Sequence, residues 1–176
     1  MGTVFVDRDG VINEKPKDGS YVTSWSEFAF MPGAIHAIRL LNEASRRVIA
    51  VTNQRGIARG IMTTDDLEVI HRRMLDELNT AEAHLDAVYY CPHAEGSCEC
   101  RKPRVGLFLR AKTDFPDIAF DDAFVIGDSD RDMEAGRRLG ARLIRIGQVG
   151  APDELCSGSL ADAVVRYVLA AKIEPD

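Results

Sequence analysis

The stretch that decides the fold is Val4-Phe5-Val6-Asp7-Arg8-Asp9-Gly10, in which an apolar run ends abruptly in two carboxylates. A short run of β-branched and aromatic residues predicts a buried strand, and Gly10 permits a sharp exit from it. The two aspartates therefore follow the first strand, at the edge where open α/β sheets bind ligands. Carboxylates this close repel unless a cation or proton lies between them. The pattern indicates a metal site in which one carboxylate acts as a covalent nucleophile and the other transfers a proton. An ordinary turn after a strand is the alternative interpretation.

A second acidic strand end favours the metal site. The run Phe124-Val125-Ile126 leads into Gly127-Asp128-Ser129-Asp130-Arg131-Asp132, and a helix is predicted from Met133 to Leu139. Oxygen ligands from two strand ends can converge on one hard cation, which suits Mg²⁺. Helix capping is the alternative for Ser129, Asp130 and Asp132. We assign Asp130 to capping and solvent, and Asp128 to the site.

A third strand end carries a hydroxyl and amides instead of carboxylates. The strand predicted at Val48–Val51 runs into Thr52-Asn53-Gln54, with Arg55 and Arg59 close behind. A hydroxyl and exposed amide N–H groups at a strand end can hold a phosphate. An ordinary connection between strand and helix is the alternative interpretation.

Three of the four cysteines and one of the four histidines lie within ten residues, spaced Cys91-x-His93-x4-Cys98-x-Cys100. Three cysteines and a histidine are a ligand set of structural zinc sites, although the spacing differs from that of zinc fingers. A disulfide and a set of small buried residues are the alternatives. Gly96, Ser97 and Glu99 weaken the second, because they make the segment too polar for a core. Four protein ligands would close the site and order the loop at 91–103, which carries Arg101 and Lys102. Cys156 stands apart and is interpreted as a packed thiol.

Composition and charge restrict the class of protein. A chain of 176 residues with 45% hydrophobic residues suits one domain, and we expect residues 1–176 to form it. A net charge of −6 argues against nucleic-acid or anionic-membrane partners. No run reaches transmembrane length, and a strand so near residue 1 leaves no room for a signal peptide. We therefore expect a cytoplasmic protein, and a monomer.

Apolar runs and helical patterns alternate along the chain, which predicts an α/β fold with a mainly parallel sheet. A loop or flap is expected at 14–20. We expect strands at 4–6, 48–51, 87–90, 124–126 and 142–146, and helices from Pro32-Gly33, then at 63–81, 106–114, 133–139 and 160–171. His36, His71 and His84 fall on or near helical patterns and are interpreted as surface or packing residues.

The order of these motifs, Asp-x-Asp-Gly, Thr-Asn, Lys and Gly-Asp-x-x-x-Asp, resembles the haloacid dehalogenase (HAD)-type phosphohydrolases over nearly the whole chain. Residues 5–13 resemble the branch that contains histidinol phosphatases and D-glycero-D-manno-heptose 1,7-bisphosphate 7-phosphatases. Residues 52–60 and the segment 91–103 are similar to the heptose enzymes. The resemblance implies a three-layer Rossmann-like core with little or no cap domain, and a small phosphosugar as substrate.

The resemblance also implies the roles of individual residues. Asp7 corresponds to the nucleophile and Asp9 to the general acid and base, with Thr52 and Lys102 holding the transferring phosphoryl group. Mg²⁺ would bind Asp7, the carbonyl of Asp9 and Asp128, and Asp132 would orient Lys102 or a metal-bound water. Zinc would bind Cys91, His93, Cys98 and Cys100. The residues that would contact the rest of the substrate, including its second phosphate, are Asp18, Gly19, Ser20, Tyr21, Asn53, Gln54, Arg55 and Arg101.

Two features depart from the heptose enzymes. Ser129 stands where these enzymes often carry a lysine, and the zinc loop is short, so the preferred anomer stays open. A histidinol-phosphate phosphatase is an alternative, although its loop after Thr-Asn-Gln usually lacks the pattern at 56–60. A nucleic-acid 3′-phosphatase module is a further alternative, which the net acidity disfavours. A non-catalytic sugar-phosphate binding module is the alternative from a different class, and the presence of both Asp7 and Asp9 argues against it.

Overall fold

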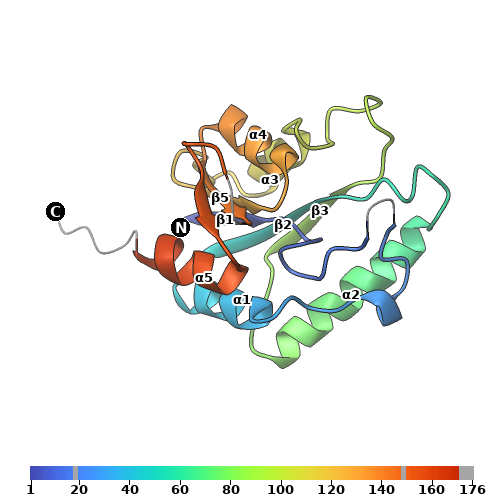
Figure 1. Cartoon of the computed structure of the whole chain (residues 1–176), viewed down its shortest axis with the longest axis horizontal. Coiled ribbons are helices and arrows are strands. Elements are labelled where there is room, and N and C mark those ends of the chain that lie inside the picture. The colour runs from blue at the N-terminus through green and yellow to red at the C-terminus, as the bar shows by residue number, and fades with distance from the viewer. Residues whose placement is uncertain (18–19, 148–149, 171–176) are drawn as a thin grey trace.

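The computed structural model describes residues 1–17, 20–147 and 150–170, and shows a parallel sheet with helices on both faces (Figure 1). Within these ranges six strands pair in the order β3-β2-β1-β4-β5-β6, and every neighbouring pair is parallel. The strands are β1 (Thr3–Val6), β2 (Arg47–Asn53), β3 (Ala87–Cys91), β4 (Phe124–Gly127), β5 (Arg142–Ile146) and β6 (Leu155–Ser157). The α/β fold with a parallel sheet that the sequence predicts is confirmed.

The helices divide into two layers, one on each face of the sheet (Figure 1). Strand β1 shows how the layers form, because Val4 and Val6 pack into one core while Phe5 packs into the other. This alternation is the two-residue period of a strand that is buried on both faces. One layer holds α1 (Ala34–Glu43), α2 (Thr64–Thr80) and α5 (Leu160–Ala163), and the other holds α3 (Gly106–Asp114) and α4 (Asp130–Leu139).

Helix boundaries follow from capping residues. Helix α2 begins after Thr63, whose hydroxyl and the Asp66 carboxylate form a reciprocal capping box. Helix α4 is capped by Ser129 and ends at Gly140, which has φ of 71°. It begins at Asp130, three residues before the predicted start at Met133, because acidic residues are favoured in a first turn.

Two further elements differ from the sequence prediction. Strand β6 was not predicted, since three residues at the edge of a sheet make no recognisable apolar run. The helix expected at 160–171 is observed as α5 followed by a short π-helix, η2 (Val164–Leu169). Residue 171 lies outside the described residues. A short turn, η1 (Trp25–Glu27), precedes α1. None of the helices described is long and apolar enough to cross a membrane.

The sheet topology decides where the candidate catalytic residues meet. Strand β1 lies between β2 and β4, and Val6 pairs with Ala50 on one side and with Ile126 on the other. The carboxyl ends of these three strands are therefore adjacent. Asp7 and Asp128 directly follow β1 and β4, and Thr52 and Asn53 are the last residues of β2, which extends two residues beyond the predicted strand end. These side chains meet beside β1, from which the strands follow in sequence order toward β3 on one side and toward β6 on the other.

Candidate active site

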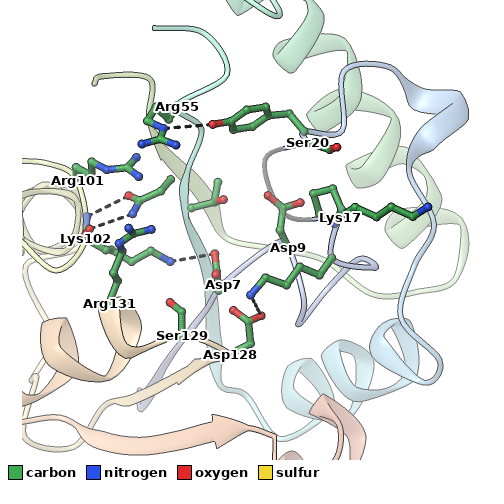
Figure 2. Close-up of a pocket in the computed structure, with 15 residues that line it drawn as sticks. Asp7, Asp9, Lys17, Ser20, Arg55, Arg101, Lys102, Asp128, Ser129 and Arg131 are labelled. Carbon is green, nitrogen blue, oxygen red and sulfur yellow. Dashed lines mark hydrogen bonds and ion pairs between the residues drawn. The ribbon is translucent and has the colours of Figure 1, made fainter. Parts of the chain in front are cut away.

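A pocket at the carboxyl edge of the sheet collects side chains from all three strand ends (Figure 2). Asp7 continues β1, and its backbone N–H donates to the carbonyl of Ile126 at 2.9 Å. Gly10 turns the chain with φ of 91°, and a Cβ atom there would lie 2.4 Å from Oδ2 of Asp128. Glycine is therefore required for the first acidic loop to approach the second so closely.

Lys102 is the buried cation at the centre of the site. Its Nζ lies 2.9 Å from Oδ1 of Asp7 and 2.5 Å from Oδ1 of Asp132, and it also donates to the carbonyl of Val51. Reciprocal 3.0 Å hydrogen bonds join the Asn53 side-chain amide to the backbone of Lys102. The lysine is thus fixed through its backbone as well as its ammonium group.

The charges around Lys102 shift one another's ionisation. Burial, together with the nearby Asp132 carboxylate, raises the pKa of Asp7 to about 7. Burial also disfavours the ammonium of Lys102, but the Asp132 and Asp7 carboxylates outweigh it and raise the pKa of Lys102 above its usual range. The other oxygen of Asp132, Oδ2, accepts from the N–H and hydroxyl of Ser129 at 3.2 and 2.5 Å. The buried Asp132 therefore fixes the position of the Lys102 ammonium group.

The Asp9 carboxylate is held by four donors. Its Oδ1 accepts from Nε and Nη2 of Arg8 at 3.2 and 2.8 Å and from the Asn13 amide at 2.9 Å. Its Oδ2 accepts from Nε2 of Gln54 at 2.9 Å, and the same Nε2 donates to Oγ1 of Thr52 at 2.9 Å. Burial acts to raise the pKa of Asp9, but Arg8 and the amides of Asn13 and Gln54 hold it below its usual value.

Carboxylate oxygens of Asp7, Asp128 and Asp132 lie within 4.8 Å of one another, a spacing that one cation can bridge. A set of hard oxygen donors at a strand edge fits Mg²⁺. Both oxygens of Asp132 are bound, one by Lys102 and one by Ser129, whereas only Oδ1 of Asp7 accepts hydrogen bonds from the described residues. Asp7 and Asp128 are therefore the carboxylates more open to a cation. Nζ of Lys15 lies 2.7 Å from Oδ2 of Asp128.

The cysteine segment folds into a second cluster beside the pocket. Sγ of Cys100 lies 3.3 Å from Sγ of Cys91 and of Cys98, and 3.2 Å from Nδ1 of His93. One atom from each of these four residues lies within 4.8 Å of the others. Four soft donors packed this closely fit a tetrahedral ion and suggest a zinc site.

One side of the pocket is basic. Figure 2 shows Arg55, Arg101 and Arg131 on one side of it. Arg101 is only 7% exposed, and its Nη1 has no hydrogen-bond partner within the part of the chain that the structure describes. Burial and the neighbouring Arg131 guanidinium lower the pKa of Arg101. A buried, unpaired donor among like charges is costly unless an anion binds there.

The structure brings most of the predicted site residues to one pocket. The predicted residues that line it are Asp7, Asp9, Ser20, Tyr21, Thr52, Asn53, Arg55, Arg101, Lys102 and Asp128. Gln54 is buried behind it and contacts Asp9 and Thr52 instead. Asp18 and Gly19 lie outside the described residues.

Several residues of the site were not predicted. Lys15, Lys17 and Arg131 line the pocket, and Arg8 and Asn13 lie behind Asp9. Arg131 follows Ser129 by two residues. Both residues line the pocket, so Arg131 supplies a cation close to the position where a lysine was expected.

Comparison with known proteins agrees with this geometry. A HAD-hydrolase-like family model matches residues 99–170. The chain is 44% identical over 144 residues to D-glycero-β-D-manno-heptose-1,7-bisphosphate 7-phosphatase of Rhodopseudomonas palustris, covering 77% of this chain and 78% of that protein. It is 37% identical over 163 residues to the corresponding α-anomer enzyme of Mycobacterium bovis, covering 91% and 84%.

A solved structure shares both fold and sequence. The D,D-heptose 1,7-bisphosphate phosphatase from B. bronchiseptica, crystallised with magnesium and phosphate, superposes with a TM-score of 0.88 at 29% identity, covering 97% of this chain and 99% of that one. These levels of identity and coverage confirm the family that the motifs indicate. The chain belongs to the heptose-1,7-bisphosphate 7-phosphatase family of HAD-like hydrolases.

Proposed function

We propose that this chain is an Mg²⁺-dependent phosphatase that removes the 7-phosphate of D-glycero-D-manno-heptose 1,7-bisphosphate through an aspartyl-phosphate intermediate. The observation that carries the proposal is the arrangement of Asp7 between Lys102 and Asp128, with Asp9 beside it. Arg101 also lines the pocket, and its Nη1 has no hydrogen-bond partner among the described residues. Relatives at 37–44% identity bear the same activity in their names.

The side chains divide the chemistry between them. Oδ1 of Asp7 accepts from Lys102 and from the backbone N–H of Arg8, which leaves Oδ2 as the attacking atom. Attack on phosphorus forms the aspartyl-phosphate and breaks the P–O bond to the sugar, whose oxygen takes a proton from the protonated form of Asp9. That form is the minor one in the free pocket, because Arg8 and the two amides lower the pKa of Asp9. Asp9 then removes a proton from water as the water attacks phosphorus and Asp7 departs. Thr52 and Lys102 contact the transferring oxygens and stabilise their charge.

Two metal ions complete the proposal. Asp7, Asp128 and the carbonyl of Asp9 would hold Mg²⁺, which neutralises charge where phosphoryl oxygens meet carboxylates. Cys91, His93, Cys98 and Cys100 would hold zinc in a closed site with no position for a substrate. Zinc in that site would order the loop that carries Arg101 and Lys102, so its role is structural.

The second phosphate of the substrate is assigned to Arg101, with Arg55 and Arg131 on the same side of the pocket. Arg101→Lys is expected to lower kcat/KM for the bisphosphate by about tenfold or more, because a guanidinium binds a phosphate through two hydrogen bonds and an ammonium does not. A small monophosphate should lose much less, since it does not reach this contact. Equal losses on both substrates would assign Arg101 to the reacting phosphate or to the loop instead.

The substrate itself is tested with a panel. Both anomers of the heptose bisphosphate, histidinol phosphate and simple sugar phosphates are compared by kcat/KM, with phosphate release as the readout. We expect a heptose bisphosphate to be preferred far above histidinol phosphate. A preference for histidinol phosphate would overturn the substrate assignment and leave the phosphatase chemistry intact. One relative is named for the β anomer and another for the α anomer, so the panel also decides which anomer this enzyme prefers.

The proposal also covers the domain organisation, the oligomeric state and the cytoplasmic location of the enzyme. Residues 1–176 are assigned to one HAD-like domain that carries the zinc-binding loop at 91–103, acting as a monomer. None of the four cysteines forms a disulfide, and three of them would bind zinc, which agrees with a cytoplasmic setting.

A further inference from the structure

A buried guanidinium lies directly behind the general acid of the proposed reaction. Arg8 is completely buried, although arginine is rarely found in a protein core unless it is paired. Its Nε and Nη2 both donate to Oδ1 of Asp9. Its remaining terminal nitrogen, Nη1, lies 3.2 Å from Nε2 of His71 on helix α2. Arg8 is thus fixed from two sides, by its chain neighbour Asp9 and by His71, which lies 63 residues later in the chain.

His71 is suited to accept from this guanidinium. Burial and the neighbouring Arg8 charge lower the pKa of His71 to about 3, so the ring is neutral. Because a guanidinium can only donate, Nε2 must be the unprotonated nitrogen and the ring proton must reside on Nδ1. The ring also packs edge-to-face on Tyr90 of β3, with centroids 5.7 Å apart. Helix and sheet together therefore fix its orientation.

The contacts distinguish the two oxygens of Asp9. Oδ1 accepts three hydrogen bonds, two from Arg8 and one from Asn13. Oδ2 accepts one, from Gln54, as far as the described residues show. A carboxylate oxygen with three donors has no room for a proton. The proton that passes to the leaving sugar must therefore be carried by Oδ2.

We propose that His71 is a positioning residue for the reaction, which holds Arg8 so that Asp9 presents Oδ2 to the leaving group. The proposal rests on the proposed phosphatase function. Without the Nε2 acceptor, Nη1 of Arg8 is a buried donor with no partner, and the guanidinium must shift to find another. Such a shift releases Oδ1 and allows the carboxyl group to rotate. His71 touches neither the substrate nor the reacting atoms.

The test uses the dependence of the reaction on its leaving group. A sugar alkoxide needs a proton from Asp9 as it departs, whereas p-nitrophenolate is stable without one. His71→Leu, which removes the acceptor and keeps an apolar side chain, should lower kcat/KM for the best sugar phosphate of the panel by about tenfold or more. The loss on p-nitrophenyl phosphate should be under about threefold. His71→Gln, which offers an oxygen near the Nε2 position, should restore most of the difference.

His36→Gln is the matched control. His36 lies on helix α1, as His71 lies on α2, and its Nδ1 is 3.2 Å from Nη2 of Arg39, but its side chain is exposed. It should leave both substrates unaffected. Equal losses on both substrates in His71→Leu, or wild-type behaviour in a folded sample, would overturn the proposal. If His71→Leu does not fold, the ¹⁵N NMR shifts of His71 in the wild type provide the test, and they should show an unprotonated Nε2. A protonated Nε2 in that spectrum would also overturn it. Failure of the wild type to hydrolyse any phosphomonoester would instead refute the proposed function, and the NMR result would still decide the His71 contact.

Discussion

Asp7→Asn is expected to lower kcat/KM by about a thousandfold or more, because loss of a covalent nucleophile removes the pathway itself rather than one contact within it. The protein should stay folded. Burial and Asp132 already raise the pKa of Asp7 to about 7, so the site disfavours the charge that asparagine removes. Lys102 keeps its ion pair with Asp132 and its bond to the Val51 carbonyl. Steady-state kinetics on the best substrate of the panel provide the measurement, together with circular dichroism.

Asp130→Asn is the matched control. Asp130 lies on the same acidic segment as Asp128, but its side chain is 96% exposed and pairs with Arg145 at 2.7 Å. Its kinetics should equal those of the wild type. Near-normal turnover by Asp7→Asn, in a sample whose mass excludes deamidation to aspartate, would remove Asp7 from the mechanism.

The second large effect is expected on stability. Cys98→Ser removes one of four zinc ligands, and loss of a structural metal belongs to the few changes that cost more than about 4 kcal/mol. For a chain of this size that corresponds to a fall in Tm of about 8–16 °C. Purified wild type should contain about one zinc per chain, and the variant far less. Elemental analysis and calorimetry on the same preparations measure both quantities.

Cys156→Ser provides the comparison, because Cys156 lies on β6, away from the cluster. The Cys156→Ser variant should contain as much zinc as the wild type and have the same Tm. Absence of zinc from wild type prepared without chelators would refute the zinc site. Retention of zinc by Cys98→Ser, with an unchanged Tm, would show that Cys98 is not a ligand.

The fold was predictable because its strands are buried on both faces and therefore form short continuous apolar runs. Phe124-Val125-Ile126 is such a run, and it is observed in β4. Strand order was not predictable, because it depends on which side of β1 each returning strand packs. Strand β6 was missed for a related reason: Leu155-Cys156-Ser157 gains its structure by pairing with β5 rather than from its own sequence.

The site was predicted where one residue type has one chemical use, and missed where a role depends on distant partners. Paired aspartates after a strand suggest a metal in any α/β chain. Arg8, by contrast, reads as a solvent-exposed charge until His71, 63 residues later, is seen beside it. His71 was interpreted as a surface or packing residue, and its burial agrees with packing while its bond to Arg8 adds a polar contact. Contacts between helix α2 and the loop after β1 leave no trace in local sequence.

The position of β1 between β2 and β4 has a thermodynamic consequence. Asp7 and Asp128 are 121 residues apart in the chain and become neighbours only when β1 and β4 pair. An unfolded chain therefore offers a divalent ion scattered carboxylates but no site. An ion that binds only the folded chain raises the free energy of unfolding, by about 2.7 kcal/mol at a concentration of one hundred times its Kd. The concentration of the cation and the stability of the folded enzyme are therefore linked through the pairing of β1 with β4.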